Sequence, residues 1–312
     1  MNSCKNMIII CLSTYNGIQF LQEQLSSLED QDYNHSDFLL LCRDDGSDDE
    51  SYEFLRQFTL NSSLQVKLLT DCNNMGVKKS FELLMNTALD MGGEYILFCD
   101  QDDIWKKDKI EKTILKMKEM ENQYPNLPIL VHSDLAVVDE DMNLLNNSFW
   151  KYQNIDPQKS SLHNFIVDNN ITGCTAMLNS HLARLIQNIP KEAIMHDWWI
   201  AMVASTFGQI GYINEPLILY RQHARNDTGA KKYGWRYGYN QFLKKPSLMK
   251  YITQAKVFLE QYRSHLTSDH IEILDAISRL DQMNWFEKRK VLIKYKIFKN
   301  GFIRNLGLMV FA

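Results

Sequence analysis

The first hundred residues alternate short apolar runs with longer segments in which apolar residues recur at helical spacing. The apolar runs predict four strands, at Met7–Leu12, Phe38–Cys42, Gln65–Leu69 and Glu94–Cys99. The segments between them predict three helices, at Ile18–Leu28, Ser51–Leu60 and Lys79–Met91. Because strands that alternate with helices form parallel sheets with crossover helices, we expect an α/β fold.

The pattern after residue 100 extends this fold. A helix is predicted over Lys106–Tyr124, and Pro125 and Pro128 end it. The remaining predicted elements are strands at Ile129–Asp139 and Ile171–Leu178, a buried helix at Asp197–Thr206, and a closing pair of strands at Gln209–Ile213 and Leu217–Arg221. We expect a catalytic domain over residues 1–230, followed by a helical, basic C-terminal region over residues 231–312.

Polar clusters follow three of the predicted strands: Ser13–Gly17, Asp44–Asp49 and Asp100–Asp103. In open parallel sheets the ligand lies beyond the carboxyl ends of the strands, so these clusters are expected to converge on one site. The sequence has no GxGxxG after the first strand and no GxxxxGK[ST], which argues against a dinucleotide fold and a P-loop.

The two acidic clusters each allow two interpretations. Asp100, Asp102 and Asp103 repel one another unless a divalent cation, Mg²⁺ or Mn²⁺, lies between them. They could instead cap the helix that follows, and the residues alone leave both interpretations open. Asp45, in the second cluster, could accept from a pyrimidine base or bind ribose, although spacing alone favours a polar turn there.

The formal net charge of −4 hides two opposite regions. Residues 1–230 hold 18 Lys and Arg against 32 Asp and Glu, whereas residues 231–312 hold 16 against 6. Within the basic region, Val291, Tyr295 and Phe298 fall near one side of a helix that is rich in lysine. We favour a basic amphipathic helix on an anionic membrane surface over a helix packed on the catalytic domain. No nucleic-acid module is recognisable, so no nucleic-acid partner is expected.

The six cysteines show no CxxC pair or regular spacing, which is typical of reduced thiols in a cytosolic protein. No signal peptide and no run of about 18 apolar residues is present, so neither secretion nor a membrane span is expected.

Four motifs, IIICLSTYNG, CRDDGSDDES, NNMGVKKSFELLMNTA and EYILFCDQDDIWKKDKIE, resemble a family 2 glycosyltransferase in their order and spacing. The resemblance continues to about Gly229 through ITGCTAMLN, MHDWWIAMVA and LYRQHARNDTG. The DQDDIW form resembles bacterial rhamnosyltransferases of cell-surface polysaccharide synthesis. The resemblance implies a GT-A-like, doubly wound, mainly parallel sheet with flanking helices.

The resemblance also implies roles for single residues at the donor site. Thr14 and Tyr15 would border the nucleotide, and Asp45 would accept from a ring nitrogen of the base. Asp100 and Asp102 match the family's DxD pair, which holds the metal and the ribose. Gln101 between them would belong to the same site.

Two residues near the end of the catalytic region are further candidates. His223 is similar to a histidine that completes the metal site in some members, and neutral imidazole is a competent ligand for Mn²⁺. Its alternative is an ordinary surface or hydrogen-bonded histidine. Arg221 could pair with the diphosphate, because the guanidinium fork suits phosphate oxygens.

Asp197 resembles the family's catalytic base. Displacement at an anomeric carbon requires one carboxylate to take the proton of the acceptor hydroxyl, and it inverts that carbon. The alternative is a cap for the apolar helix that begins at Trp198. Trp198 and Trp199 could offer a face to a sugar ring or lie in the core.

Taken together, the residues and the resemblance imply an inverting, metal-dependent glycosyltransferase with dTDP-rhamnose as first donor and a UDP-hexose as second. A saccharide or lipid-linked acceptor and a cytoplasmic location, peripheral on the inner face of the cell membrane, are expected. A catalytically silent nucleotide-sugar-binding protein would be expected to lack Asp197 or the metal carboxylates. A nucleotidyltransferase would need a Gly-rich basic loop after the first strand, which Ser13–Gly17 is not.

Overall fold

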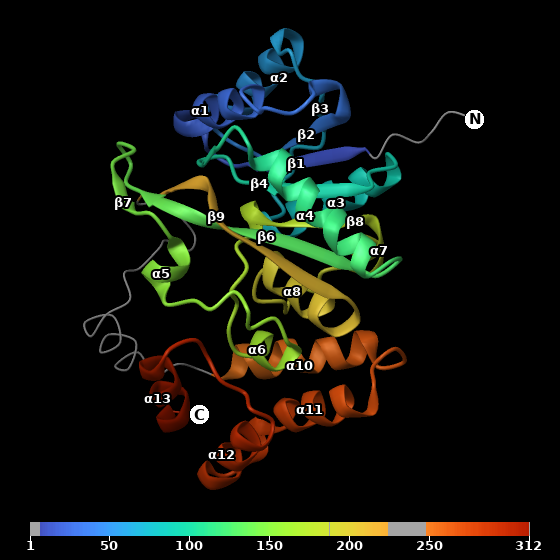
Figure 1. The fold of residues 1–312 in the computed structure, drawn as a ribbon, viewed down its shortest axis with the longest axis vertical. Helices are drawn as coiled ribbons and strands as arrows, with labels where there is room; N and C mark the ends of the chain where they lie inside the picture. Colours follow the sequence, from blue (N-terminus) through green and yellow to red (C-terminus); the bar gives the residue numbers. More distant parts are fainter. Residues whose placement is uncertain (1–6, 187, 224–247, 312) are drawn as a thin grey trace.

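A nine-stranded mixed sheet forms the centre of the protein in the computed structural model, which describes residues 7–186, 188–223 and 248–311 (Figure 1). The strand order is β3-β2-β1-β4-β8-β6-β9-β5, and β7 pairs with β6. The strands are β1 (Ile8–Thr14), β2 (Phe38–Asp44), β3 (Val66–Leu68), β4 (Tyr95–Cys99), β5 (Ile104–Trp105), β6 (Ile129–Val138), β7 (Leu144–Asn146), β8 (Met177–Asn179) and β9 (Gln209–Arg221). The half that contains β1 to β4 is parallel, so the carboxyl ends of these strands meet at one edge.

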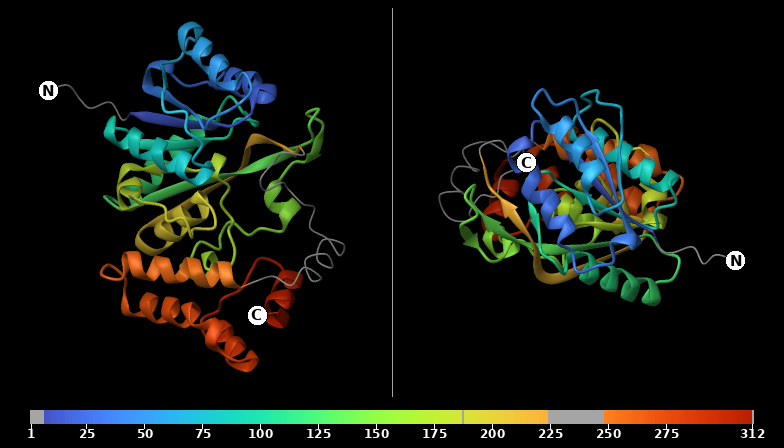
Figure 2. Two further views of the ribbon diagram at one scale, coloured as in Figure 1. Left: turned by 180° about the vertical axis from the view of Figure 1, so that it is seen from behind. Right: turned by 90° about the horizontal axis from the view of Figure 1, so that it is seen from above.

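Helices cover both faces of the sheet (Figures 1 and 2). The helices are α1 (Ile18–Glu29), α2 (Ser51–Asn61), α3 (Val77–Asp90), α4 (Lys109–Gln123), α5 (Phe149–Gln153), α6 (Leu162–Phe165), α7 (Ser180–Ile186), α8 (His196–Phe207), α10 (Met249–Tyr262), α11 (Ser268–Ser278), α12 (Trp285–Lys294) and α13 (Phe302–Phe311). The last four, α10 to α13, lie beyond α6 and α8 rather than on the sheet (Figure 1). Three short 3-10 helices are η1 (His35–Asp37), η2 (Gly173–Thr175) and η3 (Leu280–Gln282).

The alternation of side chains along β1 divides the core in two. Ile8, Ile10 and Leu12 pack with α1 and α4 on one face. Ile9 and Cys11 pack with α3 and α8 on the other. Each face of the parallel half is therefore buried, which explains why its strands are continuous apolar runs. The predicted α/β sheet with helices on both faces is confirmed.

Two predicted strands differ from the observed ones. The two strands predicted at the end of the catalytic region are one continuous strand, β9. The polar stretch 214–216 resembles a turn in the sequence, but it stays within the strand because the pairing of β6 with β9 shifts register twice near Asp134. Of the strand predicted at Ile171–Leu178, only the end is extended, and Gly173–Thr175 is the 3-10 helix η2. This departure matters because η2 faces the cleft described below.

The C-terminal helices belong to the same core as the sheet. The cluster that holds Ile9 extends through α10 and α11 to Leu308 in α13. Val291 and Tyr295 pack against that cluster, so this face of the predicted amphipathic helix contacts protein, as in the alternative interpretation. The helix also stops at Lys294, because Lys296 adopts a positive φ of 52°. The predicted boundary at residue 230 lies outside the described residues.

Candidate active site

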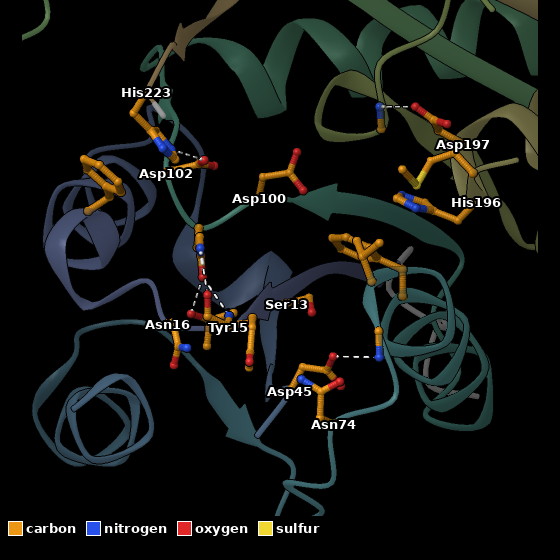
Figure 3. A pocket seen from close by; sticks show the side chains of 18 of the residues that line it. Ser13, Tyr15, Asn16, Asp45, Asn74, Asp100, Asp102, His196, Asp197 and His223 are labelled. Atoms are coloured by element: carbon orange, nitrogen blue, oxygen red, sulfur yellow. Dashed lines mark hydrogen bonds and ion pairs between the residues drawn. The ribbon is translucent and has the colours of Figure 1, made fainter. Parts of the chain in front are cut away.

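A cleft of about 780 Å³ opens where β1, β2 and β4 end (Figure 3). Its first side, which we name the strand wall, consists of the residues that follow these strands together with the end of β9: Thr14, Tyr15, Asp45, Asp100, Asp102 and His223. The opposite side, the helix wall, consists of residues of η2 and the start of α8: Gly173, Met195, His196 and Asp197. Asp100 lies between the two walls in Figure 3.

Gln101 joins two loops of the strand wall. Its Oε1 accepts from the Thr14 hydroxyl at 2.6 Å and from the Tyr15 N–H at 2.8 Å, and its Nε2 donates to the Tyr15 carbonyl at 3.2 Å. A Cβ at Gly17 would lie 2.1 Å from Gln101 Oε1, so only glycine permits this approach. The contacts of Gln101 therefore fix the loop after β1, and they leave the half-exposed Tyr15 ring at the rim of the cleft.

Asp45 is held at the floor of the strand wall by three donors. Its carboxylate pairs with Arg43 and accepts from the backbone N–H groups of Met75 at 3.0 Å and Gly76 at 2.9 Å. Arg43 is completely buried and also donates to Ser80 Oγ at 3.0 Å and to the Asn73 carbonyl at 2.6 Å. A buried ion pair with all these partners fixes the carboxylate at the place where the sequence predicted contact with a base.

The other carboxylates of this cluster shape the loop instead. Asp44 accepts from the Gly46 and Ser47 N–H groups at 3.1 and 2.8 Å, and Asp49 accepts from the Ile18 and Ser51 N–H groups at 3.3 and 2.9 Å. The polar-turn interpretation thus holds for these two residues, although Asp49 also lines the cleft together with Asp45.

Asp102 and His223 meet at one side of the strand wall. His223 Nε2 lies 2.7 Å from Asp102 Oδ2, and the imidazole ring stacks on Phe20 with 4.5 Å between centroids. Both residues line the cleft. A carboxylate beside an imidazole is a donor set that Mn²⁺ or Mg²⁺ accepts, with positions left for phosphate oxygens. The structure therefore brings together two of the three predicted ligands.

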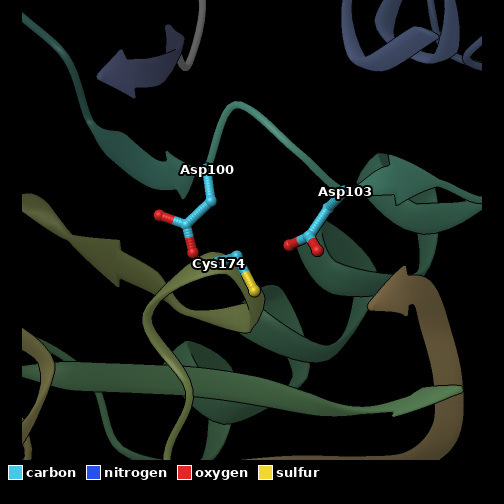
Figure 4. A group of neighbouring side chains, drawn as sticks. All are labelled: Asp100, Asp103 and Cys174. Carbon is cyan, nitrogen blue, oxygen red and sulfur yellow. The ribbon is translucent and has the colours of Figure 1, made fainter. Parts of the chain in front are cut away.

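Asp100, the third predicted ligand, lies instead with Asp103 and Cys174, and the possible ligand atoms of these three are all within 4.8 Å of one another (Figure 4). Burial raises the pKa of the Asp103 carboxyl and of the Cys174 thiol well above their usual ranges. The Cys174 thiol is therefore protonated at neutral pH, and burial disfavours the charged form of the Asp103 carboxyl, whereas hard cations prefer charged oxygen ligands. The chemistry favours Asp102 and His223, with Asp100 between the walls, over the buried group.

Asp197 is the acidic residue of the helix wall. It lies in the first turn of α8, where Oδ1 accepts from the Trp198 N–H at 2.5 Å and Oδ2 accepts from the Gly173 N–H at 3.1 Å. Met195, not Asp197, is the cap residue of this helix. Burial raises the pKa of Asp197 to about 7, although these hydrogen bonds oppose the shift. A carboxylate with this pKa, in a cleft, can accept a proton at neutral pH.

His196 lies beside it in an apolar setting. Its ring stacks on Phe81 at 4.5 Å and meets the edge of Phe98 at 5.5 Å. Neither ring nitrogen has a hydrogen-bond partner among the described residues, and burial lowers the pKa of His196 to about 3. The imidazole is therefore neutral, and it leaves Asp197 as the group of the helix wall that can take a proton.

The family follows from one comparison. The family model described as glycosyl transferase family 2 matches residues 9–182, which is more than half of the chain. The chain belongs to this family. The resemblance noted in the sequence is confirmed, and the protein is a glycosyltransferase.

Relatives of this glycosyltransferase have names from bacterial polysaccharide synthesis. It is 27% identical over 229 residues to the dTDP-rhamnosyl transferase RfbG of Shigella flexneri, covering 70% of this chain and 74% of the relative. It is 25% identical to the putative teichuronic acid biosynthesis glycosyltransferase TuaG of Bacillus subtilis, over 71% of this chain and 81% of the relative. A third relative is a UDP-Glc-dependent β-1,3-glucosyltransferase, WfgD of Escherichia coli, 27% identical over 55% of this chain and 59% of the relative.

Solved structures confirm the GT-A fold. Residues 1–349 of TarS from Staphylococcus aureus align with a TM-score of 0.58 at 16% identity, covering 92% of this chain and 72% of that one. The mannosyltransferase PcManGT of Pyrobaculum calidifontis, solved with GDP-Man and Mn²⁺, aligns with a TM-score of 0.53 at 14% identity, covering 93% and 86%. At these identities the likeness concerns the fold.

Arg221 of the glycosyltransferase does not have the predicted placement, because it is not among the residues that line the cleft. Its guanidinium pairs with Glu23 and donates to the carbonyls of Asp102 and Glu140, each at 3.0 Å. These contacts argue against a diphosphate contact and make Arg221 a support for the loop that carries Asp102.

The two tryptophans after Asp197 also point away from the cleft. Trp199 is completely buried against Phe258 and Tyr262. The indole N–H of Trp198 donates to the Phe165 carbonyl at 2.5 Å. The interpretation of these rings as a sugar platform is therefore wrong, and both serve packing.

Sequence reasoning missed Arg43 and Phe81 as parts of the site. Arg43 could have been suspected, because a charged residue at the end of the apolar run Phe38–Cys42 needs a buried partner. Phe81, which lines the cleft from α3, has no such signal. A phenylalanine at helical spacing usually lies in a core, and only the fold shows which core meets a cleft.

Proposed function

We propose that this glycosyltransferase transfers rhamnose from dTDP-rhamnose to a saccharide on a lipid carrier, with inversion and with a divalent cation, in cell-surface polysaccharide synthesis. The observation that carries the proposal is the separation of two chemistries across one cleft. Asp102 and His223 lie on the strand wall, and Asp197, with a pKa of about 7, lies on the helix wall.

The strand wall suits a nucleoside diphosphate. Tyr15 at the rim offers a ring face to a base, and Asp45 offers carboxylate oxygens that three donors hold in place. Asp102 and His223 would hold Mn²⁺ or Mg²⁺. When bound, such a cation neutralises the negative charge that develops on the departing diphosphate.

The helix wall suits the acceptor. As the acceptor hydroxyl oxygen bonds to the anomeric carbon, the bond from that carbon to the phosphate oxygen breaks, and the nucleoside diphosphate leaves with the electron pair. Asp197 takes the proton of the hydroxyl. Attack from the face opposite the leaving group inverts the anomeric carbon, and the placement of Asp197 and Asp102 on opposite walls supports this direction.

The relatives support the choice of donor. RfbG, a relative at 27% identity, is named a dTDP-rhamnosyl transferase. A UDP-hexose is the second candidate, because WfgD is named as a UDP-Glc-dependent transferase and TarS has been solved with UDP-GlcNAc. The lipid-linked acceptor is supported in the same way, since the name of WfgD includes a diphosphoundecaprenol acceptor.

A panel of donors tests the proposal. The protein is incubated with dTDP-rhamnose, UDP-glucose, UDP-N-acetylglucosamine or GDP-mannose, each with Mn²⁺, with Mg²⁺ or with EDTA. Thermal shift reports binding and nucleotide release reports turnover. We expect the largest shift and the fastest release with dTDP-rhamnose, and only in the presence of metal. Preference for a UDP-hexose would select the second candidate, and no response to any nucleotide sugar would contradict the proposed function.

A further inference from the structure

Six large apolar side chains are exposed on the last two helices, and five of them lie at the start of α12 and along α13. Phe302 is 80% exposed, Phe286 71%, Trp285 53%, Leu306 48% and Val310 40%. We name this set the α12–α13 face. Single exposed apolar residues are ordinary, but a cluster of this size, with three aromatic residues at more than half exposure, is typical of an interaction surface.

The α12–α13 face is continuous. Phe302, Leu306 and Val310 are four residues apart, so they form one stripe along α13. The Trp285 indole N–H donates to the Val310 carbonyl at 3.4 Å, and the Trp285 ring contacts that of Phe286 with 4.9 Å between centroids. The stripe on α13 therefore continues onto the start of α12.

Arg289 fixes the two helices to each other. It is buried, and its guanidinium donates to the carbonyls of Met309 at 2.7 Å and Val310 at 2.9 Å near the end of α13. The same guanidinium lies 3.8 Å from the centroid of the Trp285 ring. The face is thus preorganised, and it needs no rearrangement to present its side chains.

The fold does not use this face. The opposite side of α12 packs through Val291 and Leu292 against the core shared with the sheet, and α13 packs through Leu308. The apolar character of the exposed side therefore has no role in packing among the described residues. The described residues leave this side open to an occupant.

The charge of the region indicates which occupant. Residues 285–312 contain seven Lys and Arg and one acidic residue, Glu287, whereas the whole chain has a net charge of −4. Lys288 and Lys290 lie on α12 itself, and Lys296 follows it. Exposed apolar and aromatic residues beside lysines match the interface of an anionic bilayer, where rings enter the headgroup region and lysines contact phosphate.

We propose that the α12–α13 face inserts into an anionic lipid bilayer and anchors the transferase to it. No described helix has the length and apolar character to cross a membrane, so the contact is with one leaflet. In Figures 1 and 2 α13 lies on the side toward which β1 runs, which is the side of the cleft. This membrane anchor adds to the proposed function and depends on it for one point only. If the acceptor is carried by a lipid, that lipid would lie in the same bilayer.

The test uses the full chain and vesicles that contain no acceptor. Sedimentation is measured with vesicles of phosphatidylcholine and phosphatidylglycerol at about 2:1, and with phosphatidylcholine alone. The variant is the triple change Phe302→Ser, Leu306→Ser and Val310→Ser. The matched control is Leu60→Ser with Leu115→Ser, which removes apolar side chains that are 69% and 60% exposed on α2 and α4.

We expect the parent chain and the control to sediment with the anionic vesicles and the triple variant to bind at least about tenfold more weakly. Binding should fall at high salt and on neutral vesicles, because lysine attraction to lipid is screened. Melting temperatures and release of nucleotide from the soluble donor should be unchanged in all three proteins, which separates this test from that of the proposed function.

Three results would overturn the anchor. The parent chain could fail to bind anionic vesicles, or the triple variant could bind as well as the parent. Alternatively, light scattering could show a dimer that the triple variant converts to a monomer, and the face would then be an interface between copies. Vesicle binding by a chain that uses no nucleotide sugar would leave the anchor standing and remove the proposed function.

Discussion

The two walls of the cleft hold their carboxylates in opposite ways. On the strand wall Asp45 is surrounded by an arginine and backbone N–H donors, and Asp102 lies beside an imidazole. On the helix wall Asp197 accepts from the backbone N–H groups of Trp198 and Gly173, but burial outweighs these hydrogen bonds and raises its pKa to about 7. The first arrangement fixes carboxylate oxygens in place, which suits a cation and a nucleotide. The second favours a group that gains and loses a proton at neutral pH.

The same contrast exists between two neighbours in the sequence. Asp102 faces the cleft, whereas Asp103 is completely buried and its pKa is raised well above the usual range of a carboxyl. The pair shows that an acidic motif is not uniform in function. One residue is available to a ligand, and the next is buried and accepts from the Arg221 backbone N–H at 3.4 Å.

The largest expected effect comes from changing one of these neighbours. Asp102→Asn should lower transfer by about 10³ or more, because it removes the charge that would hold the cation, whose stabilisation of the departing diphosphate amounts to several kcal/mol. Asp103→Asn is the matched control, since Asp103 is buried outside the cleft lining and asparagine keeps its size, and it should keep transfer within about twofold. Both are measured as transfer rates across a titration of Mn²⁺. Equal rates for the two variants would contradict the division of roles.

The pH dependence of transfer reports on the helix wall. Asp197 is deprotonated above its pKa of about 7, so kcat/KM should be constant at higher pH. Below that pH the protonated fraction grows, and the rate should fall about tenfold for each pH unit. The measurement is the initial rate from pH 5 to pH 9 with saturating metal. If kcat/KM instead falls as the pH rises through 7, a group other than Asp197 accepts the proton.

A smaller effect is expected on the strand wall behind Asp45. Arg43→Lys keeps the charge but loses the fork that joins Asp45, Ser80 and the Asn73 carbonyl. We expect the donor KM to rise about fivefold, which corresponds to the ~1 kcal/mol of one hydrogen bond, and kcat to change less. A fall in kcat with an unchanged donor KM would show that Arg43 does not position Asp45 for the donor.

Much of the strand wall was predictable from the sequence. Thr14, Tyr15, Asp45, Asp100 and Asp102 follow apolar runs directly, and parallel strands bring their carboxyl ends to one edge. Asp197 and His223 lie more than 90 residues further along the chain. Only the resemblance to a family placed them near the same cleft, because no local pattern encodes a contact over that distance.

The errors have physical reasons as well. Arg221 looked available because its sequence neighbours are polar, but Glu23 from α1 reaches it across 198 positions. Trp198 and Trp199 are core residues whose position beside Asp197 in the sequence says nothing about direction. The exposed apolar stripe of α13 could not be predicted from the sequence for a similar reason, since only packing decides which apolar face of a helix is covered.

The most direct test of the central claim is Asp197→Asn, with the transfer rate and the calorimetric affinity for donor and Mn²⁺ measured on the same preparation. Asparagine keeps the size of the side chain and can still accept from the Trp198 N–H, but it cannot take a proton. The account predicts unchanged donor affinity and a transfer rate lower by about 10² to 10⁴. A variant that binds the donor normally and transfers at the parent rate would show that Asp197 is not the base.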